Sequence, residues 1–143
     1  MDDSMVNKVH WSFWVISIFM LIWNAAGCVN FFVQMNPEMV SSYLEAEQAI
    51  IAGRPLWATA GFAIAVFGGA IGCILLLLKN ATSLHLLIVS LVGVLIATVH
   101  SLTVDINFGL GEIIGVVIMP TVVAILMIWY CQYVKGKGWL STT

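Results

Sequence analysis

Five polar side chains stand out in this sequence because they lie inside long apolar segments or at their edges. Asn24 and Asn30 fall within one such segment, His100 falls near the end of another, and Arg54 and Glu112 lie at segment ends. Polar groups within a membrane are costly, and they often mark functional sites. Histidine also changes its charge near neutral pH. One interpretation is a pocket in which Asn24, Asn30 and His100 hydrogen-bond a small ligand or relay a proton. Glu112 would be their partner, and Arg54 lies at the same level.

The same side chains also have a purely structural interpretation. Asparagine amides join transmembrane helices by hydrogen bonds, so Asn24 and Asn30 would hold helices together. His100 and Glu112 would then meet only interfacial water. The sequence favours this structural interpretation over the pocket.

Other kinds of chemistry lack the residues they need. A metal site takes at least three well-placed ligands, and His100 with Glu112 falls short, so neither a metal nor a cofactor is predicted. The cysteines Cys28, Cys73 and Cys131 have no Cys-x-x-Cys spacing, and we interpret them as small residues that pack between helices. Hydrolase, metalloprotease and phosphate-binding motifs are missing from the sequence. A net charge of −2 without a basic stripe gives no reason to expect nucleic acid. We therefore predict a protein that is not an enzyme.

Composition indicates the surroundings of these side chains. Of the 143 residues, 62% are hydrophobic and 8% are charged, whereas soluble domains average roughly 45–50% and about 25%. These few charged side chains cannot cover a protein surface in water. We therefore expect most of the chain to be surrounded by lipid. Four apolar stretches reach the length of about 20 residues that a helix needs to cross a bilayer. They cover residues 11–34, 56–78, 84–104 and 113–133, and none contains Asp, Glu, Lys or Arg.

These stretches must be helices, because a backbone in lipid has to satisfy its own hydrogen bonds. Short connections then predict an all-α fold, an antiparallel bundle of four transmembrane helices forming one domain over residues 1–143. Lys8, Lys79, Lys135 and Lys137 fall on one side of the membrane and Arg54 on the other. Because cytoplasmic flanks retain Lys and Arg, both chain ends are predicted to be cytoplasmic.

The connection between the first two spans carries its own helix signals. Asn36 can cap a helix, Pro37 suits its first position, and Gly53 followed by Pro55 can end it. Apolar residues recur at helical spacing between these signals. The sequence predicts one amphipathic helix over 37–52, lying on the outer membrane surface.

Small residues repeat every fourth position on the second and third spans. Such stripes let helices approach closely, so they predict a contact between two helices, within one chain or between two copies. Pro120 removes a backbone hydrogen bond and predicts a kink in the fourth span. The stripe residues are Gly61, Ala65, Gly68, Gly69 and Gly72 on the second span and Gly93, Ala97 and Ser101 on the third.

Several short patterns together resemble a known family. They are Trp11-Ser12-Phe13-Trp14, Leu21-Ile22-Trp23-Asn24, Pro55-x-Trp57, Met119-Pro120 and the closing Gly138-Trp139-Leu140. Over nearly its whole length the chain resembles a mostly uncharacterised family of four-span bacterial inner-membrane proteins, sometimes loosely labelled sugar transporters. The resemblance implies the architecture and a bacterial inner membrane, and it assigns no functional residue.

Two functions of different class follow as predictions. The first is a non-enzymatic membrane protein that associates with itself or serves a membrane partner. The second is a small oligomeric transporter or channel that uses the outer polar cluster. In both cases the chain has the lipid bilayer as its main partner.

Overall fold

Four long helices dominate the computed structural model, which describes residues 9–104 and 108–141. The first three are α1 (Trp11–Val33), α4 (Leu56–Leu77) and α5 (Ser83–Thr103). The fourth span, Leu110–Gly136, is built from α6 (Leu110–Ile113), the π-helix η2 (Ile114–Ile118) and α7 (Met119–Gly136). Two short helices, α2 (Pro37–Val40) and α3 (Glu45–Ala52), lie between α1 and α4.

All four spans are long and apolar enough to cross a membrane. The predicted all-α bundle is confirmed, and the chain is a small multi-pass membrane protein. The first three spans match the predicted boundaries to within one residue, whereas the fourth begins three residues earlier and ends three residues later. Large apolar side chains point outward along these spans, as in a protein that has lipid around it.

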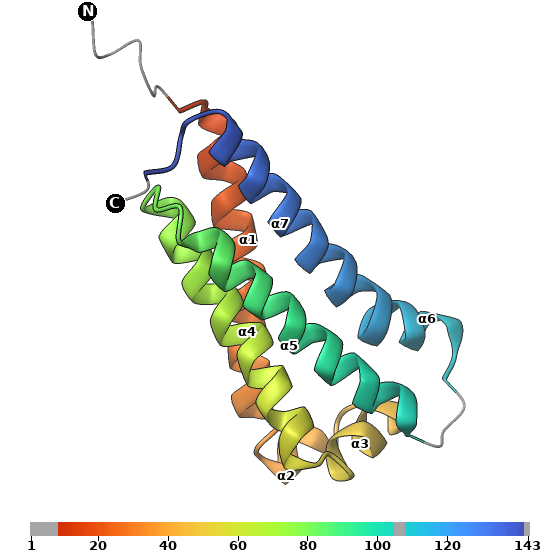
Figure 1. The fold of residues 1–143 in the computed structure, drawn as a ribbon. Coiled ribbons are helices and arrows are strands. Elements are labelled where there is room, and N and C mark those ends of the chain that lie inside the picture. The colour runs from red at the N-terminus through yellow and green to blue at the C-terminus, as the bar shows by residue number, and fades with distance from the viewer. Residues whose placement is uncertain (1–8, 105–107, 142–143) are drawn as a thin grey trace, which may run out of the picture.

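The helices run antiparallel, so the bundle has two distinct ends (Figure 1). The start of α1, the α4–α5 hairpin and the last turn of α7 lie at one end, which we call the terminal end. The short helices α2 and α3 lie at the other, which we call the α3 end. α4 packs most extensively against α5 and also against α1, while α7 packs mainly against α5.

The α4–α5 hairpin turns at a residue in the left-handed conformation. Lys79 has φ 59°, and its N–H bonds the carbonyl of Leu76 while the N–H of Asn80 bonds that of Leu75. This pair of bonds is the Schellman pattern that ends helices, usually with glycine at the left-handed position. The carbonyl of Ser141 accepts a bond from the N–H of Ala81, so the segment that follows α7 is fastened onto the hairpin at Ser141.

Glycines allow α4 and α5 to touch backbone to backbone. A Cβ added to Gly93 would lie 2.5 Å from the nitrogen of Ala65 and 2.6 Å from the carbonyl oxygen of Gly61. One added to Gly72 would lie 2.8 Å from Leu87. The contact between the two stripes is therefore made within one chain. Gly69 lies between α1 and α5, because a Cβ there would overlap Oδ1 of Asn24 and would lie 3.1 Å from the hydroxyl oxygen of Ser90.

The prediction of a single helix over 37–52 is wrong, because the segment is broken at residues 41–44. The hydroxyls of Ser41 and Ser42 donate to the carbonyls of Glu38 and Met39, and such local bonds compete with helix continuation. Leu44 then takes an extended conformation before α3 starts. The ends were predicted well, since Asn36 caps α2 through its side chain and α3 stops at Ala52.

Pro120 follows the π-helical segment of the fourth span. The wider η2 turn ends at Ile118, and Pro120 occupies the first turn of α7. Proline removes a backbone donor and crowds the preceding turn, and a π-bulge is one way in which a helix absorbs this. The hydroxyl of Thr121 donates to the carbonyl of Val117 at 2.9 Å, which adds a bond between η2 and the first turn of α7.

Candidate functional site

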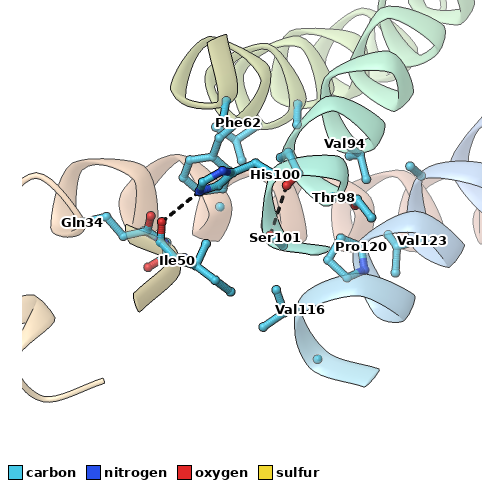
Figure 2. Close-up of a pocket in the computed structure, with 18 of the residues that line it drawn as sticks. Gln34, Ile50, Phe62, Val94, Thr98, His100, Ser101, Val116, Pro120 and Val123 are labelled. Carbon is cyan, nitrogen blue, oxygen red and sulfur yellow. Dashed lines mark hydrogen bonds between the residues drawn. The ribbon is translucent and has the colours of Figure 1, made fainter. Parts of the chain in front are cut away.

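A cavity of about 490 Å³ lies inside the bundle toward the α3 end. Its walls come from α1, α3, α4, α5, η2 and α7 (Figure 2). Along α1 and its C-cap the wall runs from Trp23 to Gln34, which is roughly 17 Å at about 1.5 Å per residue. The cavity therefore reaches from the α3 end to about the middle of a bilayer core roughly 30 Å thick.

The terminal half of the bundle is filled with side chains. Phe13, Leu76, Leu87 and Val134 come from four different helices, and each is less than 2% exposed. They belong to one apolar cluster that also contains Met20 and Met127. The cavity thus has a closed floor and does not continue to the terminal end.

His100 joins α5 to α3 beside the cavity. It is 5% exposed, and its Nε2 lies 3.1 Å from the carbonyl oxygen of Ile50. A carbonyl only accepts, so Nε2 carries the proton and Nδ1 of the neutral ring is an acceptor. Trp57 meets the imidazole edge to face at 5.9 Å. Figure 2 shows the ring reaching across from α5 to Ile50.

Arg54 and Glu47 bring charge to the cavity wall. The Arg54 guanidinium lies 5.0 Å from the centre of the Phe62 ring, which is cation–π geometry. Burial lowers the pKa of Arg54 from its ordinary value, but that value is so high that the group stays charged at neutral pH. Both side chains line the cavity, so a polar ligand group would meet one cation and one anion there.

Asn30 and Gln34 supply amides on the α1 side. The Tyr43 hydroxyl donates to Oδ1 of Asn30 and so ties the 41–44 turn to α1. Oε1 of Gln34 is buried and has no hydrogen-bond partner among the described residues. A buried unpaired acceptor is unfavourable, so a ligand donor that reached this oxygen would gain a bond at no cost to the fold.

Asn24 lies at the floor and joins three helices. Its Nδ2 donates to the carbonyl of Met20 at 2.9 Å and lies 3.6 Å from Sγ of Cys73 and 3.5 Å from Sδ of Met127. Its Oδ1 sits where a side chain of Gly69 would be. This arrangement is the helix-joining role that the structural interpretation predicts for Asn24.

Glu112 is separated from the other predicted residues. Its Oε2 accepts from the backbone N–H of Gly109 at 2.8 Å, which closes the first turn of α6. The residue does not line the cavity. Glu112 lies inside α6, and no hydrogen bond joins it to His100.

Of the five predicted residues, the structure brings Asn24, Asn30, Arg54 and His100 around one cavity. Sequence reasoning missed Gln34, Tyr43 and Glu47. The positions of Tyr43 and Glu47 depend on the break at 41–44, which no sequence pattern marked, whereas Gln34 lies at the end of the predicted first span, one turn after Asn30. Among the residues that the structure describes, no three His, Cys, Asp or Glu side chains gather as a metal site would require.

The fold and the site define a small multi-pass membrane protein with a closed-floor cavity in one half of its bundle. Comparison with protein-family models, with curated proteins and with solved structures found no match to this chain.

Proposed function

We propose that this protein is not an enzyme and that it binds a small amphipathic molecule in the cavity. The observation that supports this proposal is the distribution of polar and apolar residues along the cavity wall. Polar groups, Arg54, Glu47, His100 and Gln34, gather toward the α3 end, while the deeper wall is largely apolar. Ligand sites of this kind are mostly apolar, with a few polar groups that fix orientation.

The cavity opens sideways between α1 and η2. Trp23 and Ala26 of α1 line it and are exposed, as is Gly115 of η2. A Cβ added to Gly115 would meet nothing within 4 Å, so there is open space beside this glycine. Because this opening faces the region of lipid around the helices, the ligand enters from the membrane.

The chemistry of the lining favours an anionic or zwitterionic head group. Arg54 offers a charged donor, and a neutral His100 ring offers an acceptor at Nδ1. The apolar part of the ligand would lie against Val66, Val123 and Met127 deeper in the cavity.

A small transporter is the alternative that uses the same cavity. Net transport would need the terminal half to open, where the apolar cluster and the bond from Ala81 to Ser141 hold the helices together. A binding protein that serves a membrane partner or a second copy needs no such opening. Binding is therefore the simpler proposal.

We also propose the orientation and the location. Lys79, Lys135 and Lys137 all lie at the terminal end, and Arg54 lies at the other. The distribution of Lys and Arg supports a cytoplasmic terminal end. The resemblance to four-span bacterial proteins supports the bacterial inner membrane. Reporter fusions to the two chain ends test the orientation, and an active cytoplasmic reporter at both ends is the expected result.

The ligand proposal is tested by filling the opening. The full chain is placed in phosphatidylcholine nanodiscs, and its unfolding midpoint Tm is followed by tryptophan fluorescence with laurate and with dodecyltrimethylammonium. Laurate should raise the Tm in a concentration-dependent manner, and the cationic amphiphile should raise it less. Gly115→Phe should abolish the response.

Gly111→Phe is the matched control, because Gly111 also faces open space but does not line the cavity. It should keep the response to laurate. Equal responses in both variants, or no response of the wild type to either amphiphile, would contradict the proposal.

A further inference from the structure

A second concave surface lies at the terminal end, between the start of α1 and the end of α7. This groove has a volume of about 530 Å³, and it shares no lining residue with the cavity. The proposed function leaves it unused. Its main lining residues are His10, Ile16, Trp129, Tyr133, Lys137 and Trp139.

The groove offers hydrogen-bond donors and a positive charge. Nδ1 of His10 accepts from the backbone N–H of Ser12 at 3.2 Å and lies 2.7 Å from its hydroxyl. With Nδ1 as acceptor, the neutral ring carries its proton on Nε2, which has no partner among the described residues. Nζ of Lys137 lies 5.4 Å from the centre of the Tyr133 ring, so the aromatic wall places the ammonium at the groove.

A buried hydroxyl next to the groove also lacks a partner. Tyr130 is 8% exposed and lines the groove, and its hydroxyl makes no hydrogen bond to any described residue. A buried hydroxyl without a partner is unfavourable. A ligand oxygen that entered the groove and reached this hydroxyl would remove this cost.

Charge and position together define the ligand. Every carboxylate among the described residues lies at the α3 end, on α2, α3 or α6, so nothing in the described part opposes an anion here. Trp129 and Tyr133 stack at 6.0 Å, and both are largely exposed at the end of a span, where aromatic rings favour the membrane interface. Below them Ile16 continues the groove along the membrane-spanning part of α1.

We propose that this groove binds the head group of an anionic phospholipid. The phosphate oxygens accept from Nζ of Lys137 and Nε2 of His10, and the acyl chains follow the crease between α1 and α7. A cytoplasmic leaflet rich in anionic lipid would supply this ligand to basic residues at the same end.

Native mass spectrometry of the full chain, released from nanodiscs, tests the proposal. Nanodiscs of phosphatidylcholine alone are compared with nanodiscs that also contain phosphatidylglycerol, and retained lipid is counted as a function of its content. Phosphatidylglycerol should be retained preferentially, and Lys137→Gln should weaken this retention about tenfold, the effect of losing one hydrogen bond to a charged group. Lys137 is exposed, so its substitution does not threaten the fold.

Lys79→Gln is the matched control. Lys79 lies at the same end, and its Nζ also sits over an aromatic ring, 5.5 Å from the centre of Trp14, but it does not line the groove. Its substitution should change retention less than twofold. Equal losses in the two variants would mean diffuse surface charge and would overturn the proposal.

Tyr130→Phe and a soluble competitor complete the test. The phenylalanine variant should fold as well as the wild type in phosphatidylcholine and should retain less phosphatidylglycerol. Glycerol 3-phosphate, which has the same phosphate but no chains, should not displace the lipid at equal concentration. Full displacement by this competitor, or no preference for phosphatidylglycerol over phosphatidylcholine, would refute the lipid assignment.

Discussion

The contact between α4 and α5 gives the sharpest prediction, because Gly93→Ala adds one methyl group at its closest point. The new Cβ would lie 2.5 Å from the nitrogen of Ala65, 2.6 Å from the carbonyl oxygen of Gly61 and 3.0 Å from Cγ2 of Ile64. Two of these neighbours are backbone atoms, which cannot turn aside as a flexible side chain can. The helices must therefore move apart.

The distance by which the helices separate determines how much free energy of unfolding is lost. Ordinary van der Waals contact begins near 3.4 Å, so the helices must separate by roughly 0.9 Å at this point. A gap of about 0.5–1 Å forfeits a quarter to a half of the attraction between packed atoms. Overpacking of this kind typically costs about 1–3 kcal/mol, and a rigid backbone contact places Gly93→Ala in the upper half of that range.

Reversible unfolding in mixed micelles, titrated with sodium dodecyl sulfate and followed by circular dichroism, measures this free energy. Gly136→Ala is the matched control, because a Cβ there meets nothing within 4 Å. The control should be neutral or up to about 1 kcal/mol more stable, since alanine favours helix over glycine. If the two variants differ by less than about 0.5 kcal/mol, the proposed backbone contact is refuted.

Three further substitutions, with one control, probe the polar contacts. Asn24→Ala should lower the free energy of unfolding by about 0.6–1.7 kcal/mol in the same titration, because it removes a membrane-buried amide that joins three helices; an unchanged value would show that these bonds contribute nothing. Tyr43→Phe should cost about 0.5–1.5 kcal/mol and speed amide hydrogen exchange in α2 and α3, and unchanged exchange would count against the bond to α1. His100→Ala should speed exchange in α3, which its ring holds through a backbone carbonyl, while Ser101→Ala, whose hydroxyl bonds within α5, should leave α3 unchanged; equal effects would contradict this role.

The spans could be predicted from sequence because length and lack of charge decide them. Trp11, Leu56 and Thr103 lie at or within one residue of the predicted ends, since a backbone in lipid has almost no alternative to helix. The early start of the fourth span was missed because Gly109 and Gly111 are of a residue type that usually marks turns. In the structure Gly109 is the N-cap and Glu112 closes the cap.

The cavity could be predicted only in part. Asn24, Asn30 and His100 could be identified as candidates because they are polar residues within apolar spans, and hydropathy gives their depth in the membrane. Glu47 could not be found, since its position follows from local bonds of Ser41 and Ser42 that break a helix with otherwise correct periodicity. Gln34 was missed because a polar residue at the end of a span is ordinarily solvated. Hydropathy gives depth in a membrane, but it does not give the direction in which a connecting segment folds.

The central claim is that one face of α5 contacts lipid while the adjacent face of the same helix lines an internal cavity. Spin labels on adjacent residues of α5 test this claim most directly. Val99 is 55% exposed on the outer face, which it shares with Val92, Leu95 and Leu102, and Thr98 lines the cavity. In reconstituted vesicles, a nitroxide at Val99 should be relaxed by oxygen, which concentrates in lipid. A nitroxide at Thr98 should be relaxed more strongly by a polar nickel chelate than the one at Val99. Greater access of the nickel chelate to Val99 than to Thr98 would contradict the account.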